Sequence, residues 1–142
     1  MMRYLAKIEL QKDKTYLVEF PGLSGCVTEG ASLNEALHRA KEALDGWLAA
    51  SCDCALNIPE PAKQKRGKLY AIEVSLTIAF AIRLRKLRMK RGLSQAEIAK
   101  RLEITQQAYA KFETPLTTNP SLQTIERISL ALNSDVDELL VA

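Results

Sequence analysis

The sequence predicts an α+β protein in which a small βββαβ domain is followed by an all-α domain of five helices. Three observations predict this class: two N-terminal segments alternate between apolar and polar residues, one long apolar stripe at helical spacing follows them, and from Ser75 onward the pattern is helical throughout. The chain has 142 residues, of which 47% are hydrophobic and 26% charged, so it is expected to fold as one domain or as two small ones.

The strands of the first domain follow from residue alternation. Apolar and polar residues alternate from Tyr4 to Leu10 and from Thr15 to Phe20, and the polar residues between these runs suit a hairpin turn. A third short strand is predicted over Cys26 to Glu29, between glycines. The motif Ser32-Leu33-Asn34-Glu35 predicts a capping box that opens a helix. The apolar stripe of that helix predicts one face packed on the sheet; it comprises Leu33, Ala36, Leu37, Ala40, Ala43, Leu44, Trp47 and Leu48.

A segment with two prolines, Asn57 to Lys68, is interpreted as a connector. Its prolines forbid a helix, and its polar and basic residues offer nothing to bury. The charge changes across it, because residues 1–62 hold six Lys/Arg and nine Asp/Glu, whereas residues 63–142 hold fourteen and eight. Leu69 to Val74 predicts a fourth strand, so the domains are expected to span residues 1–74 and 75–142.

Five helices are predicted in the second domain: Leu76 to Lys90, Ser94 to Leu102, Thr105 to Glu113, Ser121 to Leu132 and Asp135 to Leu140. The end of the first is strongly basic, with six cations in nine positions: Arg83, Arg85, Lys86, Arg88, Lys90 and Arg91. Taken alone, such a run indicates a solvated helix face.

The second and third of these helices have helix-turn-helix spacing. Gly92 is placed to end the preceding helix in a left-handed conformation, a capping box begins at Ser94, and Thr105 is a good N-cap after a sharp turn. In this geometry the second helix of the pair enters the major groove. Gln106 and Gln107 would present a donor and an acceptor to adenine, with Lys111 one turn further; the alternative for the glutamines is an ordinary polar surface.

A series of motifs in this half is typical of one family: Leu84-Arg85-Lys86-Leu87-Arg88, Gly92-Leu93-Ser94-Gln95, Ile98-Ala99, Thr105-Gln106-Gln107, Glu113, Asn119-Pro120-Ser121-Leu122 and Asp137-Glu138-Leu139-Leu140. Over roughly residues 84–140 the chain resembles the lambdoid-repressor-like helix-turn-helix domains of the Xre class. The resemblance implies that Gln95 contacts phosphate, that Gln106, Gln107 and Lys111 face bases, and that Thr105 caps its helix and touches the DNA backbone.

Two positions depart from that family pattern. Glu103 stands in the turn where the family usually has glycine, and Thr114-Pro115 follow Glu113 where it usually has Asn-Gly. A left-handed non-glycine residue costs about 1 kcal/mol. A carboxylate near phosphates is expected to weaken DNA binding unless it points away.

The first half carries a second set of family motifs. These are the opening Arg3-Tyr4, the loop Phe20-Pro21-Gly22-Leu23-Ser24-Gly25-Cys26-Val27-Thr28-Glu29-Gly30 and the following Ser32-Leu33-Asn34-Glu35-Ala36. They resemble the HicB family of antitoxins over about residues 1–76, with Gly22 and Ser24 where the family more often has aspartate and proline. The resemblance implies a partly eroded RNase H-like domain that binds a HicA-type toxin, an mRNA-cleaving ribonuclease. An acidic domain suits the basic face of such a partner.

The residues argue against catalysis and against bound cofactors. RNase H chemistry needs several carboxylates around two metal ions, and the acids here fall on polar strand faces and the solvent side of the helix. Cys52-Asp53-Cys54 lacks the spacing of zinc or redox sites, His38 is the single imidazole, and Cys26 is expected to fill an apolar site. No catalytic residue, metal site or cofactor is predicted. The absence of a signal peptide or membrane-spanning run predicts a cytoplasmic protein with no membrane partner.

The combined hypothesis is an antitoxin that neutralises a HicA-type toxin and represses its own operon. Its partners are the toxin, operator DNA and further copies of itself, as a dimer or tetramer, because one helix-turn-helix covers few base pairs. Two alternatives stay open. One is a ligand-sensing transcriptional regulator without a toxin, and the other is an RNase H-like enzyme with a DNA-targeting domain.

Overall fold

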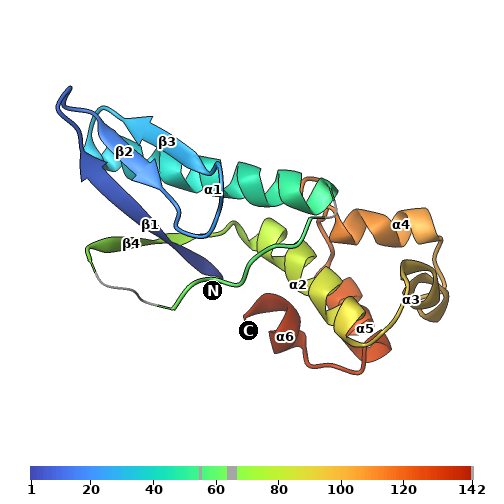
Figure 1. The fold of residues 1–142 in the computed structure, drawn as a ribbon. Helices are drawn as coiled ribbons and strands as arrows, with labels where there is room; N and C mark the ends of the chain where they lie inside the picture. The colour runs from blue at the N-terminus through green and yellow to red at the C-terminus, as the bar shows by residue number, and fades with distance from the viewer. Residues whose placement is uncertain (55, 64–66, 142) are drawn as a thin grey trace. The chain divides into compact units, whose positions relative to one another are not determined.

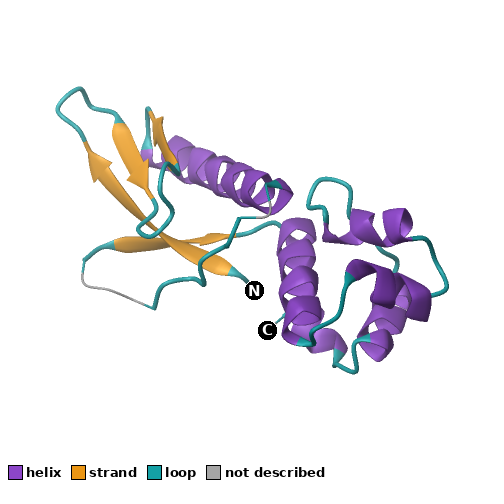
Figure 2. Cartoon of the chain, turned by 45° about the vertical axis from the view of Figure 1, so that its right-hand side comes forward, coloured by secondary structure: helices purple, strands orange, loops and turns teal. Residues whose placement is uncertain are grey.

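The computed structural model describes residues 1–54, 56–63 and 67–141, and the chain divides into two compact units. The first extends from Met2 to Val74, and the second begins at Ser75. Among the described residues, all strands belong to the first unit, and the second contains only helices and loops (Figure 2). The predicted α+β class is therefore confirmed. No helix in the described part of the chain is long and apolar enough to cross a membrane.

The first unit contains a four-stranded antiparallel sheet (Figure 1). Its strands are β1 (Arg3–Leu10), β2 (Tyr16–Glu19), β3 (Val27–Gly30) and β4 (Leu69–Glu73), arranged in the order β3-β2-β1-β4. The long β1 pairs with β2 along its second half and with β4 along its first half. The βββαβ order predicted from alternation is confirmed.

Helix α1 (Leu33–Asp53) covers one face of this sheet. The Ser32 hydroxyl caps it by accepting the backbone N–H of Glu35 at 3.1 Å. Its buried stripe, together with inward residues of β1 and β2, forms the core: Ala36, Ala40, Leu44, Leu48, Tyr4, Ala6 and Val18. β3 approaches α1 so closely that a Cβ on Gly30 would lie 2.5 Å from the backbone nitrogen of Ala36.

The predicted connector lies within the first unit. Ile58 is buried, and the carbonyl of Pro59 accepts a 2.7 Å hydrogen bond from the Tyr4 hydroxyl. Burial, followed by the charge of Glu60, raises the pKa of Tyr4 to about 12. The apolar Ile58 is thus packed in the first unit, whereas the interpretation as a connector rested on the prolines and on the polar and basic residues of the segment. Residues 64–66 of the predicted connector lie outside the described part.

The second unit contains five α-helices around one core: α2 (Leu76–Lys90), α3 (Gln95–Arg101), α4 (Gln106–Ala110), α5 (Leu122–Ala131) and α6 (Val136–Leu140). All five predicted helices are present. The third is shorter than predicted, because after Ala110 the chain tightens into the 3-10 helix η1 (Lys111–Glu113). Gly92 has a φ of +68°, as expected of a glycine that ends α2. The largest fully buried side chain of the core is Tyr109.

Candidate DNA-binding surface and partner-binding unit

Helices α3 and α4 form a helix-turn-helix whose caps are made locally. The Ser94 hydroxyl accepts the N–H of Glu97, and the Thr105 hydroxyl accepts the N–H of Ala108, each at 3.1 Å. Between the helices, Glu103 adopts the left-handed region with φ +57°. The N–H of Ile104 donates to the carbonyl of Ala99 at 3.0 Å, which closes the turn. The departure at Glu103 therefore leaves the turn intact.

Three of the residues expected to face bases lie on the surface of this motif. Gln106 and Gln107 are exposed in the first turn of α4, and Lys111 is exposed one turn later in η1. On the inward side of α4, Tyr109 is fully buried and packs edge-on against Phe112 with ring centroids 6.4 Å apart. The buried Tyr109 thus anchors α4 in the core, and the side chains of Gln106 and Gln107 point to the solvent on the other side of the helix. Contact with bases remains a prediction.

Gln95, expected to contact phosphate, is half-buried at the first position of α3. Its side-chain nitrogen lies 3.4 Å from Oε1 of Glu113, to which it donates a hydrogen bond. The structure therefore brings Gln95 together with the end of α4 and η1 (Gln106–Ala110 and Lys111–Glu113), here called the recognition segment. Its phosphate contact is untested and stays a prediction.

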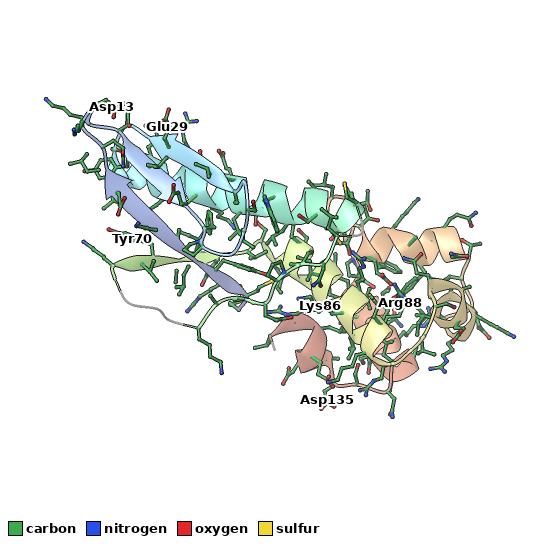
Figure 3. All side chains as sticks on the ribbon, viewed as in Figure 1. Asp13, Glu29, Tyr70, Lys86, Arg88 and Asp135 are labelled. Atoms are coloured by element: carbon green, nitrogen blue, oxygen red, sulfur yellow. The ribbon has the colours of Figure 1, made fainter. Side chains whose placement is uncertain are left out.

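A buried ion pair joins α2 to the end of the recognition segment. Arg88 donates from Nε to Oε2 of Glu113 at 2.7 Å and from Nη2 to Oε1 at 3.0 Å, with side chains 13% and 4% exposed. Arg88, which Figure 3 labels, also donates from Nη1 to the carbonyl of Leu93 at 2.8 Å, and this bond fixes the start of the motif. The hydrogen bonds to Glu113 raise the pKa of Arg88, whereas burial and then the Glu113 carboxylate raise the pKa of Tyr109.

Sequence reasoning missed this pair, although one signal for it was present. Glu113 follows the inward Tyr109 by four residues, so the helical period carries a carboxylate to the buried side, where it needs a cation. The partner could not be identified from spacing, because Arg88 is 25 residues away and lies in a run of six similar cations.

The basic end of α2 differs from the solvated face expected of an isolated basic run. Arg83 is buried and donates to the carbonyl of Leu140 at 2.8 Å, and Arg91 donates to the carbonyls of Leu132 and Asn133 at 3.1 and 3.0 Å. With Arg88, these are three of the six cations. The carbonyls that Arg83 and Arg91 bind lie at the C-terminal ends of α6 and α5, which lack intrahelical donors. The three arginines therefore hold the helices together.

The histidine and the cysteines of the first unit, which are the side chains best suited to catalysis or metal binding, make contacts that stabilise the fold or lie free of one another. His38 is exposed and pairs with Glu42 on the same helix at 3.2 Å. Cys26 is buried, its thiol donates to the carbonyl of Ala43 at 3.7 Å, and burial raises its pKa to about 11. Cys26, Cys52 and Cys54 are free thiols. In residues 1–54, 56–63 and 67–141, no group of three His, Cys, Asp or Glu side chains could hold a metal ion.

Comparison with known proteins identifies the first unit. Residues 4–84, more than half of the chain, match the family described as HicB-like antitoxins of bacterial toxin–antitoxin systems. The chain belongs to the HicB-like antitoxin family. Residues 84–139 match a helix-turn-helix family, so the HicB-like domain is followed by a second recognised domain. Both resemblances inferred from sequence motifs are confirmed. HicB-like membership implies a toxin partner, and the helix-turn-helix match implies DNA binding.

Two individual proteins illustrate these similarities. A UPF0150 protein of Archaeoglobus fulgidus is 40% identical over 47 residues, which cover 33% of this HicB-like chain and 68% of the relative. Among solved structures, the restriction-modification controller protein C.AhdI from Aeromonas hydrophila is 32% identical, with a TM-score of 0.41. That similarity covers 44% of this chain and 92% of the controller protein.

Proposed function

We propose that this protein is an antitoxin that neutralises a HicA-type mRNA-cleaving toxin through its first unit and represses the toxin–antitoxin operon through its second. It acts in the cytoplasm by stoichiometric binding and without catalysis. The observation that carries the proposal is the joining, in one chain, of a HicB-like antitoxin domain and a helix-turn-helix whose Gln106 and Gln107 are exposed.

Repression requires at least a dimer of the chain. One helix-turn-helix contacts only a few base pairs, and specific binding is gained when two such motifs occupy half-sites about one helical turn apart. We propose that Gln106, Gln107 and Lys111 face the bases of each half-site, while Gln95 and Thr105 contact its phosphates. The exposed carboxamides of α4 and the capped start of α3 support these roles.

Native mass spectrometry after gentle affinity purification from the host tests the toxin arm. The expected result is a complex with a stoichiometric small basic protein, and release of that protein should set free ribonuclease activity that the full chain suppresses when added back. Recovery of the chain with only its own copies and DNA, while the neighbouring genes are expressed, would contradict the antitoxin role.

Measurement of operator binding with the same preparation tests the proposed repressor function of the second unit. A double variant, Gln106→Ala/Gln107→Ala, should lose selective operator binding but suppress the ribonuclease as well as the wild type does. Because the variant changes only exposed residues of α4, loss of both activities would contradict the assignment of two functions to two units.

A further inference from the structure

The face of the sheet opposite α1 carries eleven side chains, here called the outer sheet face. The strand register assigns to it Arg3, Leu5, Lys7, Glu9, Leu17, Glu19, Val27, Glu29, Leu69, Ala71 and Glu73. The other face packs on α1, which contacts β2, β3 and β4. The outer sheet face is thus the solvent side of a two-layer unit.

This face is more apolar than a solvent side requires. In an antiparallel sheet with one solvent-exposed face, each strand normally alternates between apolar residues that face the core and polar residues that face the solvent. Here five of the outer positions are apolar, namely Leu5, Leu17, Val27, Leu69 and Ala71, and Val27 is 53% exposed. A group of exposed apolar side chains bordered by charges is typical of a surface that binds another protein.

The charges on this face do not cancel. Arg3 pairs with Glu73 at 2.7 Å, and Lys7 pairs with Glu9 at 3.1 Å. Glu19 and Glu29 have no cationic partner among the described residues. In the register, Glu19 lies between Val27 of β3 and Lys7 of β1, whose amine pairs with Glu9, and Glu29 lies opposite Leu17. The two carboxylates therefore alternate with apolar side chains across β2 and β3 (Figure 3 labels Glu29).

Two of the four acids of α1 are paired with cations, Glu35 with Arg39 at 3.0 Å and Asp45 with Lys41 at 3.4 Å. Glu42 lies 3.2 Å from His38, and Asp53 is the last residue of the helix, so these two acids are not neighbours. The unit as a whole is not acidic, because residues 1–74 contain ten Lys/Arg and ten Asp/Glu once the cations of residues 63–68 are counted with it. An acidic surface therefore exists locally, at β2 and β3, rather than over the whole domain.

We propose that the outer sheet face is the docking surface for a basic protein, and that this surface is centred on Leu17, Glu19, Val27 and Glu29. The identification of that protein as the toxin rests on the proposed function. Unpaired carboxylates favour a cationic partner, and the apolar side chains favour a protein over a small cation. Nucleic acid is disfavoured because it is negatively charged. A second copy is disfavoured because a two-fold contact through this face would bring Glu19 and Glu29 of both copies together.

A charge-reversal experiment on the full chain tests the proposal. The probe is a catalytically inactive form of the small basic protein that co-purifies with this chain. Glu19→Lys/Glu29→Lys should weaken its binding by about 100-fold, and Val27→Ser by about tenfold. The matched control is Glu42→Lys/Asp53→Lys, which makes the same charge change at exposed positions of α1 and should change affinity by less than about threefold. Operator affinity and circular dichroism report whether each variant is folded.

The outcomes separate this inference from the proposed function. Tight toxin binding by the wild type together with equal losses in the two double variants would overturn the docking surface and leave the antitoxin role standing. Dissociation of the chain's own oligomer by Glu19→Lys/Glu29→Lys, with toxin affinity unchanged, would likewise overturn it, because the face would then contact a second copy. Failure of the wild type to bind the toxin would overturn the proposed function itself, and the docking surface with it.

Discussion

Glu103 is one of three described non-glycine residues with positive φ, and it forms the turn between the two helices of the DNA-binding motif. Glycine removes the steric cost of that conformation, so Glu103→Gly should raise the free energy of unfolding by about 1 kcal/mol, measured by urea denaturation. It should also raise DNA affinity severalfold at low salt by removing a carboxylate near phosphates.

Glu103→Gln separates these two effects, because it removes the charge and keeps the left-handed cost. We expect it to match Glu103→Gly in DNA affinity and the wild type in stability. Equal DNA affinities for all three proteins at low salt would show that the carboxylate points away from the DNA.

Gln106 is exposed in the first turn of α4, where a carboxamide is suited to contact adenine. Gln106→Ala should lose about 1 to 3 kcal/mol of binding to operator DNA and relax the preference at one base pair, in titrations against single-base operator variants. Gln11→Ala, in the hairpin of the first unit, is the control and should bind as the wild type does. An equal loss on operator and random DNA would exclude base contact by Gln106.

The Arg88–Glu113 pair is buried, so removing one partner leaves an uncompensated charge in the core. We expect Arg88→Met and Glu113→Met each to lower the free energy of unfolding by about 3 kcal/mol, and the double variant Arg88→Met/Glu113→Met to lose less than the sum. Chemical denaturation of the four proteins completes the cycle. Additive losses would mean that the two side chains act independently, contrary to their 2.7 and 3.0 Å contacts.

At the scale of elements, the close packing of β3 against α1 depends on Gly30, because glycine has no Cβ. A Cβ on Gly30 would meet backbone atoms of Ala36 at 2.5 and 2.8 Å, and backbone cannot yield as a flexible side chain does. Gly30→Ala should therefore destabilise the first unit by about 2 kcal/mol or more in thermal unfolding. Gly46→Ala makes the same change inside α1 with open space around it, and should stabilise by up to about 1 kcal/mol. Equal effects of the two changes would contradict the close approach.

The elements were predictable because their signals are local. Alternation specified β1 and β2, and the hydroxyls of Ser32, Ser94 and Thr105 marked the starts of three helices where the structure has them. The helix-turn-helix and its outward glutamines followed from the same spacing. Non-local partners were not predictable: Arg91 binds carbonyls more than 40 residues away, and a backbone carbonyl carries no signature in sequence. A basic run taken alone indicates a solvated face, and the tertiary contacts that bury Arg83 could not be read from it.

At the scale of the whole molecule, the operator binding that we propose would depend on how two copies of the chain are held relative to each other. A two-fold symmetric dimer presents its two recognition helices at one fixed separation and on one side of the duplex, so it requires half-sites about one helical turn apart. Each chain adds a net positive charge from its second unit, where residues 75–142 hold ten Lys/Arg and seven Asp/Glu. That charge strengthens binding to any DNA, and the geometry supplies the selectivity.

Inserting base pairs between the half-sites of the operator separates these two contributions. About five extra base pairs rotate one half-site by half a turn to the opposite side of the duplex, so the full chain should bind at least about tenfold more weakly. The remaining affinity should equal that for a single half-site and should fall steeply with salt, as charge-driven binding does. Electrophoretic mobility shifts over a salt series measure both quantities. If five inserted base pairs leave affinity unchanged, the two helix-turn-helix motifs bind independently, and the dimer is not what selects the operator.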